Sequence, residues 1–153
     1  YLLRTLVPRG GATDDVAILT LRNLPYSDRF RADFKAEPEA LSQMRSLLRR
    51  WLRHGGASER TIAEVATACG EAATNAIEHS GAARDFKLSG RLVNGEIELT
   101  VRDHGQWRQP REGDHGRGLS LMRALMDTVE LTPSPEGTTV RLRRRLDSDG
   151  GSE

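Results

Sequence analysis

Apolar residues recur with a helical period in the first half of the chain and with a period of two in the second half. Between Pro38, which suits the first turn of a helix, and Gly55-Gly56, which ends one, the spacing predicts a helix. Its apolar positions are Leu41, Met44, Leu48, Trp51 and Leu52. Ser58 suits the N-cap of a second helix, which Gly81 closes. The apolar stripe of this second helix consists of Ile62, Val65, Ala66, Cys69, Ala73 and Ala76. These mostly small side chains predict close packing against a sheet.

After the second helix the period changes to two, which is typical of half-buried strands. Alternating runs at 86–92 and 97–101 flank Asn94-Gly95, which is a strong signal for a two-residue hairpin turn. Residues 103–118 are rich in Gly, His, Asp and Arg and predict a long functional loop. A helix at 119–127 should follow this loop.

A second hairpin is predicted at the end of the chain, where 129–131 should pair with 139–142. Two further strands precede the helices: one within 10–22, after a glycine turn and an acidic pair, and one at 30–35. This order predicts an α+β fold: a two-layer sandwich with a mixed, mostly antiparallel sheet covered on one face by three helices. A doubly wound parallel sheet is not expected, because the strands come in hairpins.

Composition narrows the class of protein. The chain has 153 residues, enough for one domain with a core, and 23 Lys and Arg stand against 22 Asp and Glu. This balance does not indicate a nucleic-acid binder. The longest apolar runs are too short to span a bilayer and nothing resembles a signal peptide, so we expect a cytoplasmic protein with no membrane contact. Cys69, as the single cysteine, excludes an internal disulfide and a multi-cysteine zinc site.

Arginines gather in two places. Arg45, Arg49, Arg50 and Arg53 share the polar face of the first helix, where a solvated face is favoured over a surface that docks a partner. Arg141, Arg143, Arg144 and Arg145 lie on the terminal strand. We interpret the second cluster as a solubility device on an edge strand.

The candidate chemistry begins on the second helix. Glu71, Asn75 and His79 follow one another at intervals of four residues and therefore line one side of it. Asn75 offers a neutral oxygen to Mg²⁺, and Glu71 could take a proton from an attacking hydroxyl. His79 is as suited to capping the helix end as to meeting a nucleotide.

Three further motifs follow in order. Asp103-His104-Gly105 comes directly after a strand, and its carboxylate could accept a hydrogen bond from the amino group of adenine. Gly116-Arg117-Gly118-Leu119 opens a helix, so its backbone N–H groups could face phosphates. Thr138, within Gly137-Thr138-Thr139, could close a hydrogen-bond network around Asp103. Arg117 could touch the γ-phosphate or remain solvated. Together these motifs predict a nucleotide site.

The ordered motifs E-x-x-x-N-x-x-x-H, D-x-G, G-x-G-L and G-T-T resemble those of the gyrase, chaperone, histidine-kinase and MutL (GHKL) ATP-binding superfamily, whose fold is a two-layer sandwich. The short loop between the glycine motifs and the segment EVATACGEAATNAIEHSG resemble its anti-sigma-factor serine kinase branch. The resemblance covers roughly residues 30–145.

The resemblance implies a role for each matching residue. It implies that Asn75 binds Mg²⁺, that Asp103 recognises adenine and that Glu71 is the general base. Gly105, Gly116 and Gly118 match nucleotide-contacting glycines, and Arg117, Leu119, Thr138 and His79 are candidate nucleotide contacts. The implied activity is that of an ATP- and Mg²⁺-dependent protein-serine kinase that phosphorylates a STAS-type anti-sigma antagonist and binds a sigma factor. A homodimer is the assembly that the resemblance implies.

A second resemblance concerns the stretch GGATDDVAILTLR, which is similar to the closing motif of PPM-type serine/threonine phosphatases. It implies that Asp14 matches a ligand of a catalytic metal. We therefore expect a phosphatase remnant at 1–23, a linker at 24–29, the kinase domain at 30–146 and a disordered tail at 147–153. The rest of a phosphatase domain is absent, so no phosphatase activity is expected here, and a fused phosphatase is an implied partner.

Three alternatives remain open beside the kinase. The same fold could hold ATP as a catalytically silent module that regulates a fused phosphatase. A histidine-kinase catalytic domain is disfavoured because no helix with a phospho-acceptor histidine precedes the site. A zinc site built from His104, His115, Asp103 and Asp114 is disfavoured because the glycines explain those positions better.

Overall fold

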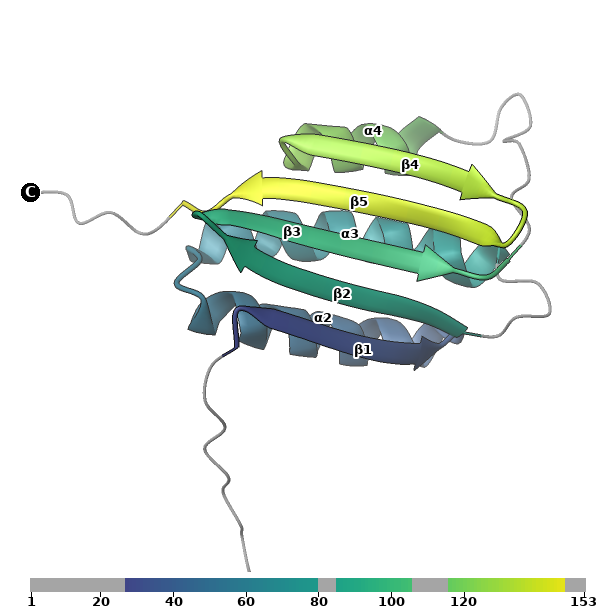
Figure 1. Cartoon of the computed structure of the whole chain (residues 1–153), viewed down its shortest axis with the longest axis horizontal. Coiled ribbons are helices and arrows are strands. Elements are labelled where there is room, and N and C mark those ends of the chain that lie inside the picture. The colour runs from purple at the N-terminus through teal and green to yellow at the C-terminus, as the bar shows by residue number, and fades with distance from the viewer. Residues whose placement is uncertain (1–26, 80–84, 106–115, 148–153) are drawn as a thin grey trace, which may run out of the picture.

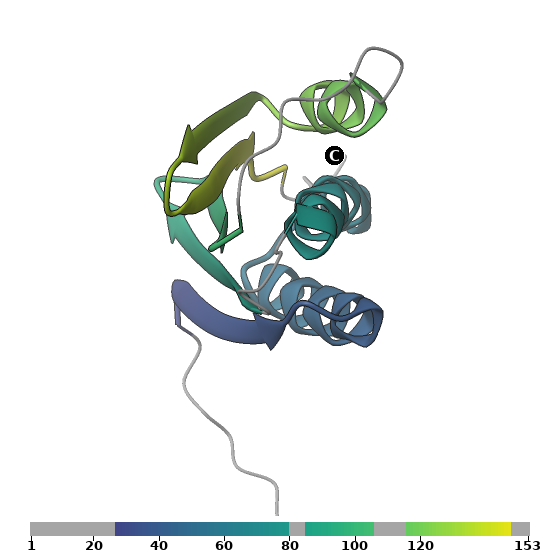
Figure 2. The ribbon, with the colours of Figure 1, turned by 90° about the vertical axis from the view of Figure 1, so that its right-hand side faces the viewer.

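Two layers make up the part of the chain that the computed structural model describes, residues 27–79, 85–105 and 116–147. One layer is a five-stranded sheet with the strand order β1-β2-β3-β5-β4, and the other consists of three helices on one face of that sheet (Figures 1 and 2). In chain order the elements are β1 (Arg29–Lys35), α2 (Pro38–His54), α3 (Glu59–His79), β2 (Asp85–Val93), β3 (Glu96–Asp103), α4 (Gly116–Leu125), β4 (Thr128–Ser134) and β5 (Gly137–Arg145). The predicted α+β sandwich is confirmed, and all pairings between these strands are antiparallel.

The strand pairing follows from the turns. Asn94 and Gly95 both have positive φ angles, 52° and 74°, which is the geometry of the tight hairpin turn predicted at this point. The chain then leaves β3, forms α4 and β4, and returns along β5, which pairs with β3. Arg102 therefore lies opposite Thr139, so the C-terminal end of β3 and the N-terminal end of β5 lie side by side at the same end of the sheet.

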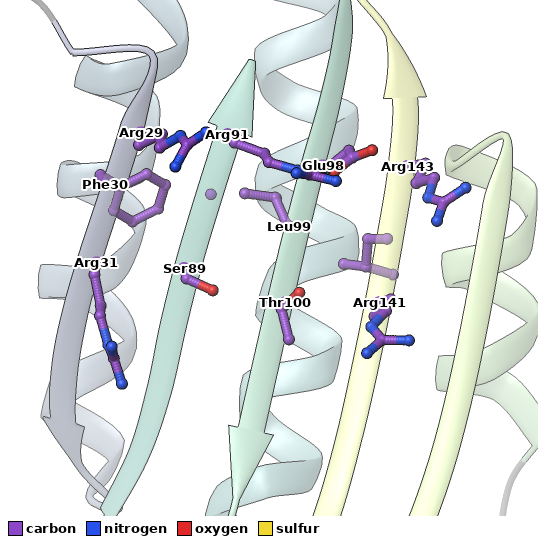
Figure 3. Close-up of a pocket in the computed structure, with 12 residues that line it drawn as sticks. Arg29, Phe30, Arg31, Ser89, Arg91, Glu98, Leu99, Thr100, Arg141 and Arg143 are labelled. Atoms are coloured by element: carbon purple, nitrogen blue, oxygen red, sulfur yellow. Dashed lines mark hydrogen bonds and ion pairs between the residues drawn. The ribbon is translucent and has the colours of Figure 1, made fainter. Parts of the chain in front are cut away.

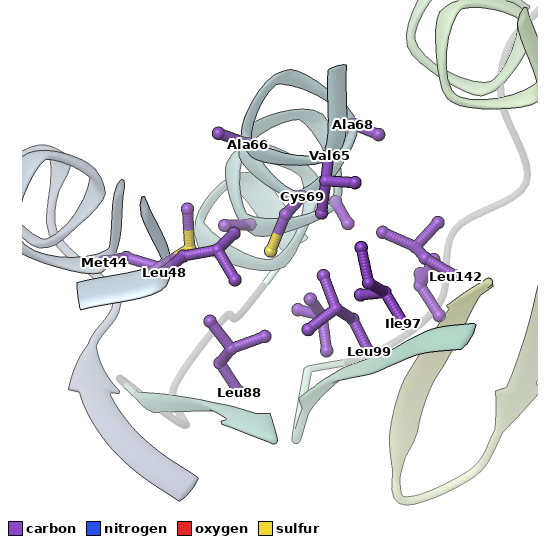
Figure 4. Close-up of a cluster of buried hydrophobic side chains, with 14 of the residues drawn as sticks. Met44, Leu48, Val65, Ala66, Ala68, Cys69, Leu88, Ile97, Leu99 and Leu142 are labelled. Carbon is purple, nitrogen blue, oxygen red and sulfur yellow. The ribbon is translucent and has the colours of Figure 1, made fainter. Parts of the chain in front are cut away.

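The core lies between the sheet and the helices. Met44 and Leu48 from α2 and Val65 and Cys69 from α3 face Leu88 and its neighbours on the sheet (Figure 4). Because the stripe on α3 is made of small residues, this helix packs against the middle strands β2, β3 and β5, as its composition predicted. Complete burial in this layer raises the pKa of the Cys69 thiol to about 12.

The third helix differs from its predicted range of 119–127. It begins at Gly116, three residues earlier, because the first N–H groups of a helix need no helical partner and its first turn accepts glycine. It ends at Leu125, because Asp127 is engaged by β5 instead. The N–H of Asp127 donates to the carbonyl of Arg143 over 2.9 Å, and the Asp127 carboxylate accepts the N–H of Arg145 over 2.8 Å.

Two further differences concern the borders of the sheet. β5 lies between β3 and β4, so the arginine cluster of residues 141–145 is not on an edge strand and the interpretation as an edge device is wrong. β1 begins at Arg29, inside the predicted linker, where the indole N–H of Trp51 donates to the carbonyl of Ser27 over 3.1 Å. The predicted strand within 10–22, the phosphatase remnant with Asp14, and most of the tail lie outside the described residues. None of the described helices combines the length and apolar character needed to cross a bilayer.

Candidate functional site

The predicted motifs meet at one end of the two-layer structure. The C-terminal ends of β3 and α3 and the N-terminal ends of α4 and β5 all lie at the same end (Figure 1). This arrangement follows from the alternating direction of the elements, since β3 and α3 run toward that end and β5 and α4 run away from it. Motifs that are separated by tens of residues in the sequence are therefore neighbours in space.

Asp103, the last residue of β3, is the centre of the first cluster. Its side chain is buried, and its Oδ1 accepts the backbone N–H of Gly105 over 2.9 Å and that of Thr138 over 3.1 Å. The first bond closes an Asx-type turn, which explains the D-x-G spacing, and the second ties β3 to the start of β5. The carboxylate is thus held in one orientation by two backbone donors.

Gly137 explains why a glycine precedes Thr138. Its φ angle is +133°, and a Cβ at this position would lie 2.0 Å from the backbone oxygen of Asp103. A side chain is excluded by both backbone conformation and space. The glycine therefore lets β5 approach Asp103 closely enough for the N–H of Thr138, itself buried, to reach the carboxylate.

Glu71 and Asn75 on α3 form a second cluster with the first turn of α4. A Cβ at Gly118 would lie 3.1 Å from Oε2 of Glu71 and 4.0 Å from Nδ2 of Asn75. Both polar side chains are half-buried, so they do not belong to an ordinary solvated helix face. The glycine therefore lets the N-terminus of α4 approach the Glu71 carboxylate and the Asn75 amide closely. Backbone N–H groups at a helix N-terminus can bind phosphate, and side-chain oxygens can bind a hard cation, so this end of α3 and α4 brings both kinds of group together.

The remaining predicted residues flank these two clusters. His79 is the last residue of α3 and is half-buried, while Gly105 follows Asp103 and is buried. Gly116 begins α4. Arg117 is exposed, and Leu119 packs against the hydrophobic core, so its side chain anchors the first turn of α4. Among the described residues, no hydrogen bond joins the Asp103 cluster to the Glu71 cluster.

The amide oxygen of Asn75 is a ligand of the kind that a magnesium ion held by few protein atoms would take. Within residues 27–79, 85–105 and 116–147, no group of three or more His, Cys, Asp or Glu side chains is arranged to hold a metal. Mg²⁺ characteristically takes one or two protein oxygens and completes its shell with phosphates and water, so the single amide of Asn75 suits it. The loop residues 106–115 lie outside the described residues. They include His115 and Asp114, two members of the alternative zinc set.

The sequence did not reveal the contact that Gly118 makes with Glu71, nor the close approach of Gly137 to Asp103. Both are contacts between elements far apart in the chain. The sequence shows the glycines themselves, since each lies where a helix or strand begins and is followed by residues that continue the element, but it does not show which residues they approach. A third contact, the guanidinium of Arg45 over Gly70, was not foreseen either: a Cβ at Gly70 would lie 3.4 Å from Nη2 of Arg45.

Comparisons with known proteins identify a family for the domain as a whole. Residues 34–144 match the family described as Histidine kinase-like ATPase domain. The anti-sigma F factor of Bacillus velezensis is 35% identical over 102 residues, which cover 56% of this chain and 70% of that protein. The anti-sigma F factor of Bacillus subtilis is 32% identical over 102 residues with the same coverage.

Solved structures give the same result. The crystal structure of the RsbU and RsbW domains of Rv1364c from Mycobacterium tuberculosis matches with a TM-score of 0.66 and 30% identity, covering 77% of this chain and 32% of that one. This chain thus spans about a third of that structure. The Erythrobacter litoralis EL346 blue-light activated histidine kinase shares the fold alone, with a TM-score of 0.53 and 19% identity over 72% of this chain and 42% of that chain. The chain belongs to the histidine kinase-like ATPase domain family, as its four ordered motifs predicted.

Proposed function

We propose that this protein is an ATP- and Mg²⁺-dependent protein-serine kinase that acts as an anti-sigma factor and phosphorylates a STAS-type antagonist. The observation that carries the proposal is the Glu71 carboxylate, which lies beside Asn75 and against Gly118 at the N-terminus of α4. A proton acceptor, an oxygen ligand for a cation and a helix N-terminus for phosphate are thus side by side. The anti-sigma F factors support the same assignment, because the match covers 70% of their length.

Nucleotide recognition is assigned to the Asp103 cluster. Oδ1 of Asp103 is held by two backbone N–H groups, which orients the carboxylate to accept a hydrogen bond from the exocyclic amine of adenine. Gly105 keeps this approach open, because it carries no side chain. Gly116 and Gly118 let the backbone N–H groups of the first turn of α4 face the phosphates, and the exposed Arg117 is assigned to the γ-phosphate. His79 is placed at the margin of the nucleotide site.

Phosphoryl transfer in this site rests on positioning and on one proton acceptor. As the serine Oγ of the antagonist forms a bond to the γ-phosphorus, the bond from that phosphorus to the β–γ bridging oxygen breaks and ADP leaves. Glu71 takes the serine proton as Oγ attacks. Asn75 would hold the magnesium ion, which supplies positive charge near the phosphates when bound. The half-burial of both side chains limits water at the reacting groups.

The partners follow from this assignment. A sigma factor and its antagonist are the proposed protein ligands, and the cytoplasm is the proposed compartment. A fused phosphatase of the PPM type, in which Asp14 would match a ligand of the catalytic metal, is proposed as a further partner, and a homodimer is proposed as the assembly.

The test measures transfer of labelled phosphate from ATP to STAS proteins of the same organism, taken one at a time. We expect Glu71→Gln to bind ATP as the wild type does while losing about a hundredfold or more of the transfer rate. Asn75→Ala should weaken binding of ATP in the presence of Mg²⁺ and leave Mg²⁺-free binding less affected. The matched control is Glu78→Gln, an exposed glutamate on the same helix, which should change neither quantity.

The silent ATP-binding module is the competing assignment. It would be correct if the wild type bound ATP tightly, transferred no phosphate to any of the antagonists, and behaved identically to Glu71→Gln in every assay.

A further inference from the structure

The face of the sheet that the helices leave open carries a regular array of polar and charged side chains. Because side chains alternate between the two faces of a strand, the strand registers place cross-strand rows on this open face. The central row, as we call it below, consists of Arg31, Ser89, Thr100, Arg141 and Glu130. It runs across all five strands, from β1 to β4.

The central row has short side chains in its middle and long side chains on either side of them. Ser89 on β2 and Thr100 on β3 carry short hydroxyl side chains, and Arg31 on β1 and Arg141 on β5 stand on either side of them (Figure 3). A groove of about 670 Å³ lies over this part of the sheet. A second groove of about 300 Å³ shares Arg31, Ser89 and Thr100 with the first. The open face therefore has a recess whose floor donates hydroxyl hydrogen bonds and whose rim is cationic.

Positive charge is concentrated on this face. One neighbouring row adds Arg29, Arg91 and Arg143 with Glu98, and the other adds Lys87 and Arg102 with Asp33. The three rows together hold seven cationic and three acidic side chains, whereas the whole chain has a net charge of only +1.

Four of the seven cations make ion pairs with described residues, and three of these pairs are long. Arg91 is held closely by Glu98, whereas the pairs of Arg102 with Glu136, at 3.6 Å, of Lys87 with Asp33, at 3.7 Å, and of Arg141 with Glu130, at 3.8 Å, are long and exposed, and such pairs contribute little. The side chain of Arg31 makes no ion pair with any described residue. The two hydroxyls are thus flanked by Arg31, which has no acidic partner among the described residues, and by Arg141, whose single ion pair is long and exposed.

We propose that this open face docks an acidic segment of a partner protein, with carboxylates received by Arg31 and Arg141 above Ser89 and Thr100. Guanidinium forks match carboxylates in a bidentate way, and the two hydroxyls add donors at the floor. The face lies on the opposite side of the sheet from α3 and α4, so a partner bound there leaves Glu71 and the first turn of α4 uncovered (Figure 2).

A protein segment fits better than a nucleic acid or a second copy. The acidic side chains Asp33, Glu98 and Glu130 would repel a continuous phosphate backbone, whereas a protein can place cations opposite them. The described aromatic residues of the sheet offer no stacking platform there, since Phe30 packs on Trp51 and Phe86 is buried beneath the helices. A second copy would present the same positive surface and be repelled.

The test uses a fluorescent peptide of about ten residues, in which glutamates are interspersed with serines and two lysines, and follows its anisotropy with the whole chain, without ATP, at about 50 mM salt. We expect Arg31→Ser combined with Arg141→Ser to weaken binding about tenfold. The matched control combines Arg49→Ser with Arg50→Ser. These two arginines are exposed on α2, so the control variant loses the same amount of charge, and its affinity for the peptide should change less than about twofold. Amide resonances of Ser89 and Thr100 should shift on binding. Arg31→Lys with Arg141→Lys, which keeps the charge and the fold, should give an intermediate loss.

Four results would overturn the docking site: no binding by the wild type, equal losses in the serine and control variants, tighter binding of an oligothymidylate of equal charge, or loss of a dimer in the serine variant. The assay needs no phosphoryl transfer, so failure of the proposed kinase activity would not affect it.

Discussion

A Cβ on Gly118 would lie 3.1 Å from Oε2 of Glu71, so the first turn of α4 rests directly against the carboxylate on α3. Neither residue is close to the other in sequence, and each belongs to a different motif. The contact makes the position of the carboxylate depend on the small size of residue 118. It also places the beginning of α4, whose partial positive charge attracts anions, beside an acidic group.

Gly118→Ala should therefore separate folding from activity. The added methyl group forces the end of a flexible side chain to move by a few tenths of an ångström, which costs little stability, and alanine is the better helix former. We expect the free energy of unfolding to change by less than about 1 kcal/mol while phosphoryl transfer falls about tenfold to a hundredfold, because the carboxylate leaves its position. Denaturant titration and the transfer assay measure the two quantities.

The control for this variant is Gly70→Ala, one residue before Glu71. A Cβ there would lie 3.4 Å from Nη2 of Arg45, an ordinary contact on the side of α3 that faces α2. It should stabilise the helix slightly and leave transfer unchanged. Equal transfer rates in Gly118→Ala and the wild type would show that the contact with Glu71 has no functional role.

Asp103 combines a structural and a recognition role that two substitutions should separate. Asp103→Asn retains an oxygen that can accept the N–H groups of Gly105 and Thr138, so the fold should persist. We expect its affinity for ATP to fall about tenfold or more, because an amide lacks the charge and can turn an N–H toward the adenine amine. Asp103→Ala leaves two buried N–H groups unpaired and should cost about 2–3 kcal/mol of stability. Calorimetric ATP binding and thermal unfolding distinguish the two effects, and unchanged ATP affinity in Asp103→Asn would remove Asp103 from the nucleotide site.

The secondary structure was largely readable from the sequence because its signals are local. The helical spacing from Leu41 to Leu52, the small-residue stripe on α3 and the Asn94-Gly95 turn each depend on neighbours within a few positions. The boundary of α4 was less predictable, because Asp127 is removed from the helix by hydrogen bonds to Arg143 and Arg145, which are distant in sequence.

Strand order and the shape of the site required the structure for the same reason. The arginines at 141–145 suggested an edge strand because they end the chain, yet β5 is paired on both sides. The motifs identified Glu71, Asn75, Asp103 and Thr138 as candidates. The sequence could not show that Gly118 touches Glu71 or that Gly137 allows β5 to approach Asp103, since both depend on how the elements pack.

Gly137→Ala should destabilise the protein far more than alanine at another glycine with positive φ. At Gly137 the methyl group would meet the backbone oxygen of Asp103 at 2.0 Å, and backbone cannot move as a side-chain end can. We expect a loss of about 3 kcal/mol or more. Gly95→Ala, at φ +74° with open space around its Cβ, should cost only about 1 kcal/mol. Urea titration of both variants provides the comparison, and similar losses would show that the clash at Gly137 is relieved by backbone movement.

Cys69 should make stability fall at alkaline pH. Burial raises the pKa of its thiol from 9.0 to about 12, because the thiolate cannot be solvated inside the core. Below about pH 9 both the folded and unfolded states hold the thiol proton, so no effect is expected there. Between about pH 9 and about pH 12 only the unfolded state loses the proton, so the free energy of unfolding should fall by about 1.4 kcal/mol per pH unit from this group alone.

Urea titrations of the wild type and Cys69→Ala from about pH 8 to about pH 10.5 isolate the effect, because all other titrating groups are common to both. The stability advantage of the wild type over Cys69→Ala should shrink as pH rises through this window, and a constant difference would mean that the thiolate is accommodated in the folded core.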